Sequence, residues 1–541
     1  MNQGFFHLNK PANEPVKAYT AESSDWKELC EELEYQASHR IEIPCVIGGK
    51  KIYTGDILDA VEPHCHGNVL AHTHLAGENE LREAVQAAME AKAEWESLSW
   101  EHRASVFLKA ADLLTGPYRK KMTAACMLKQ SKNVYEAEID VICELADFLR
   151  YNAYYLEEIY CEQPVNTHGI WNRNEYRPLD GFVAALAPFN FTSISGNLCA
   201  APAMAGNVVV WKPSTTAVLS SYYLMEIFEE AGLPAGVINF VPSRGSDFGR
   251  IVVADPKMAG FHFTGSTEVF NSIWKQVGEH IDDYESYPRL VGETGGKDFV
   301  FAHASADPDA LVSGLVRGAF AFAGQKCSAA SRAYVPASLW PQVKEKLHQA
   351  MTLVKTGDVR DIHAFLNAVI DEKSFAKVKE YLDFAKSSPD CEILEGGNLD
   401  DSVGYFIEPT IILAKKPDFR TMVEEIFGPV LTIYVYEDET LSETLALCDQ
   451  STGYALSGAI YANDRMAVVK MEKALTHSAG NFYINDKPTG AVVGQQPFGG
   501  GRRSGTNDKA GSRVNMMRWI SQRTIKENRL PDREILYPHM K

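Results

Sequence analysis

One cysteine stands in a setting that suits a nucleophile. Cys327 lies in the segment GQKCSA, where small residues crowd the thiol and a helical run precedes it. The thiolate is the reactive form, and backbone N–H groups near a helix terminus or a neighbouring cation such as Lys326 would lower the thiol pKa. A buried structural thiol is the alternative interpretation. Cys327 alone therefore does not decide the chemistry.

A carboxylate and an amide follow apolar strands elsewhere in the chain. Glu293 ends the strand of LVGETGGKDF and could act as a general base toward water, although a turn cap or ion pair would also use a glutamate there. Asn190, in APFNFT, could donate to an oxyanion, although a helix cap would use the same residue. A binding-only protein would have no physical use for Cys327, Glu293 and Asn190 together.

Two further motifs suggest ligands. In FTGSTEVF, a Gly265-Ser266 turn opens a helix, whose N-terminal N–H groups favour a phosphate, but this is not the G-x-G-x-x-G fingerprint. The segment PHCHGNVLAHTH has H-x-H spacings that could suit zinc. No acidic residue lies within that segment, and a hairpin of polar strands explains it more simply. We therefore predict no metal site.

An alternation of strands and helices must position these residues. The segments GFVAALAP, NVVVWKP, VINFVPS and FHFTGS predict buried strands, with helices over 198–206, 217–232 and 268–284. This pattern indicates a parallel, doubly wound sheet, which binds ligands at the carboxyl ends of its strands. A helical block over 80–160 precedes it, and a second α/β block runs from 303 to about 484. The tail from Asn515 is polar without a core pattern, which suits an extended arm that docks on another subunit.

Composition narrows the class of protein. A chain of 541 residues with 45% hydrophobic content should form two or three folded domains. Its net charge of −18 and scattered basic residues argue against nucleic acid or an anionic membrane as partner. Apolar runs are too short to span a membrane, and the N-terminus lacks a signal or transit pattern. The ten cysteines contain no C-x-x-C pair and are expected to be buried free thiols, with Cys327 the exception.

The order of several motifs resembles the aldehyde dehydrogenase superfamily from about residue 40 onward. These are Asn190, Lys212, Gly265-Ser266, Glu293, Cys327, Glu425-Ile-Phe-Gly-Pro and Pro497-Phe-Gly-Gly. Other segments resemble the narrower Δ1-pyrroline-5-carboxylate dehydrogenase family: FLKAADLLTGPYR, YEAEID, GQKCSA, DDSVGYFIEP, GNFYINDKPTG, VGQQPFGG and SGTNDK.

The resemblance implies NAD-dependent oxidation of L-glutamate γ-semialdehyde, which forms from Δ1-pyrroline-5-carboxylate, to L-glutamate in proline catabolism. Cys327 would form a thioester, Asn190 and the Cys327 N–H would hold the oxyanion, and Glu293 would activate the hydrolytic water. The implied NAD-binding residues are Lys212, Ser214, Gly265, Ser266, Thr267, Glu268, Val269, Glu425 and Phe427. The implied substrate-binding residues are Glu144, Lys326, Ser328, Gly490, Ala491 and Phe498. The family's carboxylate loop usually reads Thr-Gly-Ser, whereas this chain has Thr489-Gly490-Ala491, so one hydroxyl contact is missing.

The resemblance also implies an α/β fold with three parts. These are a Rossmann-like cofactor domain (1–156 and 181–302), an α/β catalytic domain (303–511) and a small β oligomerisation arm (157–180 and 512–541). A homodimer or an assembly of dimers follows. Animal members of the family work in the mitochondrial matrix and bacterial members in the cytoplasm. We expect a cytoplasmic protein, or a matrix protein if the source is eukaryotic.

Other functions fit part of the pattern. An aldehyde dehydrogenase for another ω-semialdehyde, such as succinic semialdehyde, would keep the same catalytic residues, whereas a CoA-acylating relative would not need Glu293. A non-catalytic structural protein could also have this fold, since fold does not imply function. Turnover of pyrroline-5-carboxylate beside a panel of aldehydes would separate these alternatives.

Overall fold

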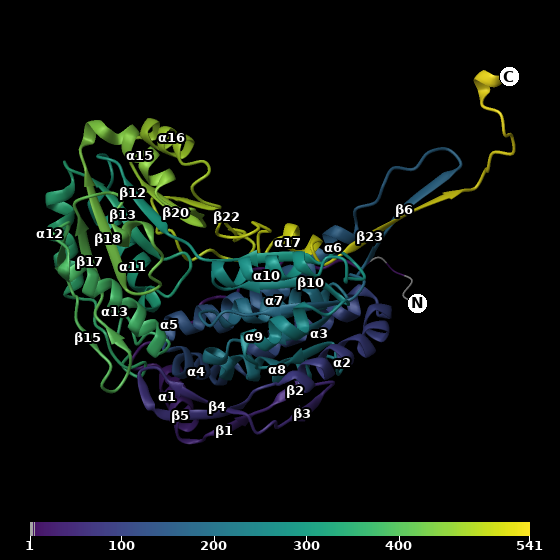
Figure 1. The fold of residues 1–541 in the computed structure, drawn as a ribbon, viewed down its shortest axis with the longest axis horizontal. Coiled ribbons are helices and arrows are strands. Elements are labelled where there is room, and N and C mark those ends of the chain that lie inside the picture. The colour runs from purple at the N-terminus through teal and green to yellow at the C-terminus, as the bar shows by residue number, and fades with distance from the viewer. Residues whose placement is uncertain (1–3, 5) are drawn as a thin grey trace.

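The computed structural model describes residue 4 and residues 6–541, which form two large sheets and a projecting arm (Figure 1). The first sheet has seven strands in the order β11-β10-β7-β8-β9-β2-β3. The first five of these in sheet order are parallel, and β2 and β3 add an antiparallel edge. Their bounds are β2 Cys45–Ile47, β3 Lys50–Ile52, β7 Phe182–Leu186, β8 Val208–Lys212, β9 Ile238–Phe240, β10 Met258–Thr264 and β11 Arg289–Glu293. The four strands predicted in this region are confirmed.

Helices pack against this sheet, and their buried side chains form two cores with it (Figure 1). The crossover helices are α7 Thr192–Met204, α8 Val218–Ala231 and α10 Thr267–Glu279. The predicted helical block comprises α2 Glu78–Ser97, α3 Trp100–Thr115, α4 Arg119–Gln130, α5 Val134–Ala137 and α6 Leu145–Tyr160. A π-helical turn, η1 Glu138–Glu144, joins α5 to α6. In α6, Leu145, Leu149 and Leu156 are fully buried at the spacing that places them on one helix face.

The histidine-rich segment forms the predicted hairpin. Strands β4 Ile57–Glu62 and β5 Cys65–His74 are antiparallel, and β1 Ile41–Ile43 joins them. The imidazoles have separate acidic partners: His72 Nδ1 lies 2.7 Å from Asp59 Oδ1, and His74 Nε2 lies 3.0 Å from Glu42 Oε2. These partners lie outside the short segment that the sequence pattern singled out.

The second sheet has the order β14-β17-β18-β13-β12-β20-β21. Its strands are β12 Asp298–Ala302, β13 Ala330–Pro336, β14 Cys391–Glu395, β17 Thr410–Ala414, β18 Val430–Tyr436, β20 Ser457–Tyr461 and β21 Asn481–Ile484. The helices around it include α11 Pro308–Phe320, α12 Trp340–Met351, α13 Glu372–Ser387, α15 Leu441–Gln450 and α16 Arg465–Ala474. Strand β12 pairs with β13 and β20, so the predicted boundary at residue 302 assigned this strand to the wrong sheet. The short segment 294–297 carries the chain from one sheet to the other.

A two-stranded ribbon projects from the body (Figure 1). Strand β6 Ile170–Arg177 pairs antiparallel with β23 Ser521–Asn528, so the two segments predicted to form the arm lie side by side. The expectation that no core residue follows Asn515 is wrong, because Met516, Trp519 and Ile520 are buried. They lie in or just after the short helix α17 Arg513–Met517, which is too brief to show a helical period.

The cysteines are less uniformly buried than expected. All ten are free thiols, but Cys161 is exposed and four others are partly exposed: Cys30, Cys65, Cys391 and the expected exception, Cys327. In the part of the chain that the structure describes, no helix combines the length and apolar character needed to cross a membrane.

Candidate active site

Four of the predicted residues lie at the carboxyl edge of the first sheet or shortly after it in the chain: Lys212, Glu293, Asn190 and Gly265. Lys212, the last residue of β8, pairs with Leu186, the last residue of β7. Thr264, the last residue of β10, pairs with Glu293, the last residue of β11. The chain leaves β7 toward Asn190 and leaves β10 at Gly265. This is the edge where parallel sheets bind ligands.

Cys327 lies on the loop between α11 and β13. The turn before it contains Phe322 and Ala323 with φ of +52° and +51°, so the backbone adopts an uncommon conformation just ahead of the thiol. Cys327 lines a small crevice, which we call the thiol crevice; its other lining residues include Gly296, Lys326, Glu425 and Phe427. The structure thus brings the predicted nucleophile together with the residues predicted for the nicotinamide end of the cofactor.

Gly296 allows the backbone on one side of this crevice to approach the Cys327 loop closely. A Cβ at this position would lie 2.3 Å from Cys327 O and 2.4 Å from Asp298 Oδ2, so no side chain fits between β12 and the thiol loop. The Gly296 N–H donates to Glu425 Oε1 at 2.9 Å. The glycines of ETGGKDF therefore serve close backbone approach.

The thiol pKa is raised, contrary to expectation. Burial raises the pKa of Cys327, and the carboxyl groups of Asp298, Glu293 and Glu425 add to the effect. The Lys326 ammonium lies 2.7 Å from Glu136 Oε2 and is paired with that carboxylate. The expectation that Lys326 lowers the thiol pKa is therefore wrong, and in this state the thiol has no strong local force that favours its ionisation.

Asn190 is tied to the thiol loop. It is buried, and its Nδ2 donates to Gln325 O at 3.1 Å, two residues before Cys327. That bond uses one of the two Nδ2 hydrogens, which leaves the other for an oxyanion. The helix-cap alternative does not apply, because α7 begins at Thr192 with Phe191 at its N-cap position.

Glu293 is a partly buried residue at the end of β11. Its Oε2 accepts the Gly500 N–H at 3.3 Å. Burial raises its pKa well above the ordinary range, although the Gly500 bond and Lys509 act in the opposite direction. A carboxyl group with a raised pKa in a buried site is suited to general base catalysis.

Comparison with known proteins agrees with this arrangement. A model of the aldehyde dehydrogenase family matches residues 53–525. The mitochondrial Δ1-pyrroline-5-carboxylate dehydrogenase of Dictyostelium discoideum is 52% identical over 99% of this chain and 96% of its own length, and the human protein of that name is 48% identical over 98% and 94%. The crystal structure of the Δ-pyrroline-5-carboxylate dehydrogenase from Mycobacterium tuberculosis bound with NAD has a TM-score of 0.96 and 49% identity, covering 100% of both chains.

The chain belongs to the aldehyde dehydrogenase family. Its motif order and fold are those expected from the sequence. Membership of the family does not by itself assign a role to any single residue.

The residues that this family member would use for a dinucleotide have suitable surroundings. Lys212 is largely buried, and burial lowers its pKa to about 8. Within the described residues, the hydrogen bond of its Nζ is a long one of 3.5 Å to Pro213 O. At the start of α10, Ser266 Oγ accepts the Val269 N–H at 3.3 Å, and Val269 is 43% exposed. The helix start therefore offers N–H groups for a diphosphate and an apolar surface beside them.

The residues predicted for the substrate fall into separate groups. Ser328 Oγ donates to Thr489 Oγ1 at 2.8 Å, so the residue after Cys327 contacts the loop that carries Gly490 and Ala491. Gly490 has a φ of +93°, which favours glycine. Phe498 forms an isolated antiparallel bridge with Ala510.

Glu144 contacts the structure at another point. Its Oε2 accepts Ser193 Oγ at 3.0 Å, so it joins the π-helical turn to α7. Burial, followed by the charge of Asp140, raises the pKa of Glu144 to about 8. The charge of Lys326, which lines the thiol crevice, acts in the opposite direction, and the role of Glu144 stays a prediction.

Sequence reasoning missed three residues beside the nucleophile. Asp298 is buried and contributes to the raised Cys327 pKa, Glu136 pairs with Lys326, and Gln325 accepts the Asn190 amide. Asp298 lies two residues after Gly296 of the Gly-Gly pair, which was a usable signal. Glu136 lies far from Cys327 in sequence, and no sequence pattern indicated that it would lie beside the thiol loop.

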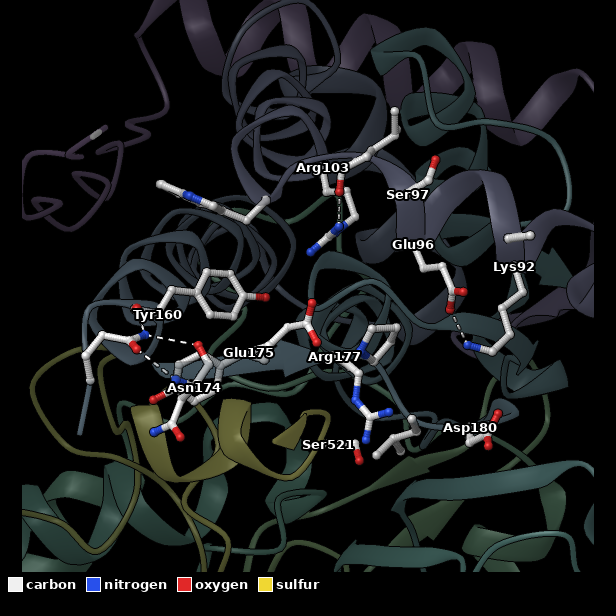
Figure 2. A pocket seen from close by; sticks show the side chains of 17 residues that line it. Lys92, Glu96, Ser97, Arg103, Tyr160, Asn174, Glu175, Arg177, Asp180 and Ser521 are labelled. Carbon is white, nitrogen blue, oxygen red and sulfur yellow. Dashed lines mark hydrogen bonds and ion pairs between the residues drawn. The ribbon is translucent and has the colours of Figure 1, made fainter. Parts of the chain in front are cut away.

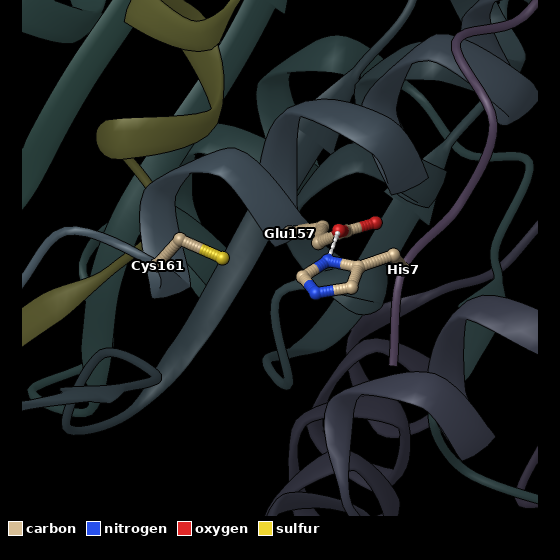
Figure 3. Close-up of side chains that lie close together, drawn as sticks. All are labelled: His7, Glu157 and Cys161. Atoms are coloured by element: carbon tan, nitrogen blue, oxygen red, sulfur yellow. Dashed lines mark hydrogen bonds and ion pairs between the residues drawn. The ribbon is translucent and has the colours of Figure 1, made fainter. Parts of the chain in front are cut away.

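One group of side chains has metal-ligand types. His7, Glu157 and Cys161 place one ligand atom each within 4.8 Å of one another (Figure 3). Glu157 already accepts hydrogen bonds from His7 Nδ1 at 2.6 Å and from the Leu8 N–H at 2.5 Å. These bonds account for the arrangement without an ion.

A larger cavity of about 790 Å³ lies at the base of the arm (Figure 2). Its lining includes Lys92, Arg103, Tyr160, Asn174 and Arg177, from α2, α3, α6 and β6. None of the residues predicted for catalysis, cofactor or substrate lines it. The cavity is therefore separate from the thiol crevice.

Proposed function

We propose that the protein oxidises L-glutamate γ-semialdehyde, in equilibrium with Δ1-pyrroline-5-carboxylate, to L-glutamate with NAD as the oxidant. The observation that carries this proposal is the thiol crevice, where Cys327 and Glu425 meet and from which Ser328 reaches the Thr489 loop. The similar proteins bear the name of this enzyme, and one was crystallised with NAD.

In the proposed reaction, the Cys327 thiolate attacks the aldehyde carbon and the carbonyl oxygen becomes an oxyanion. The second Asn190 amide hydrogen and the Cys327 backbone N–H stabilise this oxyanion. Because the thiol pKa is raised, Cys327 must release its proton to water before the sulfur attacks.

Bound NAD supplies the hydride acceptor that converts the hemithioacetal on Cys327 into a thioester. Lys212 and Ser214 would hold the adenosine end, residues 265–269 the diphosphate, and Glu425 and Phe427 the nicotinamide end. The long Lys212 hydrogen bond and the exposed Val269 fit such a ligand.

Glu293 then removes a proton from water, the hydroxyl oxygen attacks the thioester carbon, and the C–S bond breaks to release the carboxylic acid. The Cys327 sulfur takes up a proton and returns to the thiol. For the α-carboxylate of the substrate, the proposed donors are backbone N–H groups at Gly490 and Ala491, together with the Ser328 hydroxyl if it turns away from Thr489 Oγ1. Lys326, Phe498 and Glu144 are the remaining residues we assign to the substrate pocket.

The arm is proposed to join two copies of the chain in a homodimer or an assembly of dimers. We place the protein in the cytoplasm, or in the mitochondrial matrix if its source is eukaryotic. The domain limits given for the cofactor and catalytic parts remain proposals, with β12 moved to the second sheet.

NADH formation with pyrroline-5-carboxylate, succinic semialdehyde and propanal tests the proposed function. We expect the highest kcat/KM with pyrroline-5-carboxylate. Good turnover of succinic semialdehyde without turnover of pyrroline-5-carboxylate would favour the other ω-semialdehyde function. A protein that binds NAD but oxidises none of these aldehydes would contradict the proposal.

A further inference from the structure

The N-terminal segment lies along the outside of η1 and α6 without regular secondary structure. We call residues 8–20 the strap. Its backbone is held at several points: the Leu8 N–H donates to Glu157 Oε2, Tyr151 Oη donates to Pro11 O at 2.9 Å, and the Glu14 N–H donates to Asp147 Oδ1 at 2.8 Å. The strap is therefore attached along much of its length to helical residues of the first domain.

Asn13 is the strap residue that reaches beyond these helices. Its Nδ2 donates to Asp147 Oδ2 at 2.7 Å and to Val493 O at 2.8 Å. Its Oδ1 accepts Gln495 Nε2 at 2.9 Å. The side chain thus uses both amide hydrogens and its oxygen to join three segments that are distant in sequence.

The segment that Asn13 holds is the loop 489–496, which has no helix or strand of its own. Val493 is buried against Phe148 and Tyr151 of α6. Gly494 has a φ of +80°, and a Cβ there would lie 2.3 Å from Tyr151 Cε1. The loop therefore rests closely on the same helix that carries the strap.

The other end of this loop reaches the nucleophile. Thr489 accepts a hydrogen bond from Ser328, which directly follows Cys327. Only a few residues separate this contact from Val493. A backbone that binds a carboxylate through its N–H groups must be held in one conformation, and the contacts at the Val493 end restrict the loop.

We propose that Asn13 is a positioning residue for the substrate loop 489–496. It selects the loop conformation that presents the N–H groups near Gly490 to the substrate carboxylate. The proposal rests on the proposed function, in which this loop anchors that carboxylate. Loss of the Asn13 contacts would lower the fraction of molecules with a competent loop, and apparent affinity falls in proportion to that fraction.

The test compares Asn13→Ala with Glu14→Gln. Glu14 is the neighbouring strap residue, and its carboxylate pairs with Arg119 and Arg150 rather than with the loop. For Asn13→Ala, we expect KM for glutamate γ-semialdehyde to rise roughly threefold to thirtyfold, the effect of losing one or two hydrogen bonds. KM for propanal, kcat and the Kd for NAD should stay unchanged. Glu14→Gln should leave all four values unchanged.

Gln495→Ala provides a second variant on the exposed side of the loop. It should raise the same KM, and its combination with Asn13→Ala should be less than additive because both variants remove one shared contact. Gln495→Ala also serves as the test if Asn13→Ala does not fold. An unchanged KM in a folded variant would overturn the proposal, as would an equal change of KM for propanal.

Hydrogen exchange separates this inference from the proposed function. Amides of residues 489–496 should exchange faster in Asn13→Ala than in the unmodified protein, and at the original rate in Glu14→Gln. If the unmodified protein does not oxidise the semialdehyde, the proposed function fails. Unchanged exchange in Asn13→Ala would instead reject the role of Asn13, whatever the substrate.

Discussion

At the scale of single residues, the main finding is that the proposed nucleophile lies among acidic groups. Asp298, Glu293 and Glu425 each raise the Cys327 pKa, and Lys326 is occupied by Glu136. The surroundings of the thiol therefore favour its protonated form. The thiolate is the form that reacts with oxidants, so a raised pKa also slows oxidation of the sulfur.

Glu293→Gln should separate the two halves of the reaction. If Glu293 serves hydrolysis alone, acylation continues and deacylation becomes slow. The expected result is a burst of about one equivalent of NADH per site followed by slow turnover. Rapid mixing with NADH absorbance measures both phases. An absent burst would instead assign Glu293 to removal of the Cys327 proton.

Ala491→Ser should improve binding of a carboxylated substrate. The serine hydroxyl would add a donor at the position where the related family usually has one. A hydrogen bond to a charged group contributes about 1.5–3 kcal/mol, and a bridging water can already supply part of that in the unmodified protein. KM for glutamate γ-semialdehyde should therefore fall roughly threefold to a hundredfold with little change in kcat. Propanal, which has no carboxylate, is the control in the same assay. A parallel change in both KM values would show that Ala491 does not face the carboxylate.

At the scale of elements, strand β10 carries an unusual core residue. His262 is buried, its Nδ1 lies 3.0 Å from Leu198 O, and its ring lies 4.5 Å from that of Trp519. Burial lowers its pKa from 6.5 to about 3. The imidazole therefore stays neutral in the folded protein under conditions where the unfolded chain takes up a proton.

This difference predicts a loss of stability in mild acid. Because the folded pKa is the lower one, the contribution of His262 is complete above pH 6.5 and declines as pH falls toward 3. Between pH 7 and 5 the expected loss is about 2 kcal/mol. His262→Asn, which can still donate to Leu198 O, should remove this part of the pH dependence in denaturant unfolding. The same substitution at exposed His363 is the matched control and should retain the full loss.

The elements also show which features could be predicted from sequence. The strands of the first sheet were predictable because β-branched runs alternate with helical periods. Asn190, Glu293 and Cys327 were recognisable from their order along the chain. The assignment of β12 to the second sheet could not be predicted, because a Gly-Gly turn has the same sequence pattern whether the chain stays in one sheet or crosses to another. The pairing of Lys326 with Glu136 and the contact of Asn13 with Val493 depend on segments that only the tertiary structure brings together.

At the scale of the whole molecule, the arm is the part with the least stability of its own. A two-stranded ribbon is marginal in water, yet β6 and β23 extend away from the body (Figure 1). Trp171 is 48% exposed, and Ile535, Leu536 and Tyr537 in the tail are exposed as well. A second copy of the chain would cover such apolar side chains.

Removal of residues 521–541 should therefore shift the protein to a monomer. The truncation deletes β23 and leaves β6 without its partner, while the buried Trp519 remains. Light scattering after size-exclusion chromatography measures the mass. Removal of 538–541 alone, which spares the ribbon and the exposed apolar residues before it, is the control and should keep the assembly. A truncated protein of unchanged mass would assign the interface to another surface.

The short segment 294–297 limits how the two large sheets can move relative to each other. It runs directly from Glu293 at the end of one sheet to Asp298 at the start of the other, and a chain advances at most about 3.6 Å per residue. The two sheets are therefore connected by a short segment at the proposed reaction centre. The hydrogen bond from the Gly296 N–H to Glu425 further restrains this segment. If the two sheets move apart to admit or release a dinucleotide, the displacement is smallest near this segment. Glu293 and Asp298, at its two ends, would then shift least.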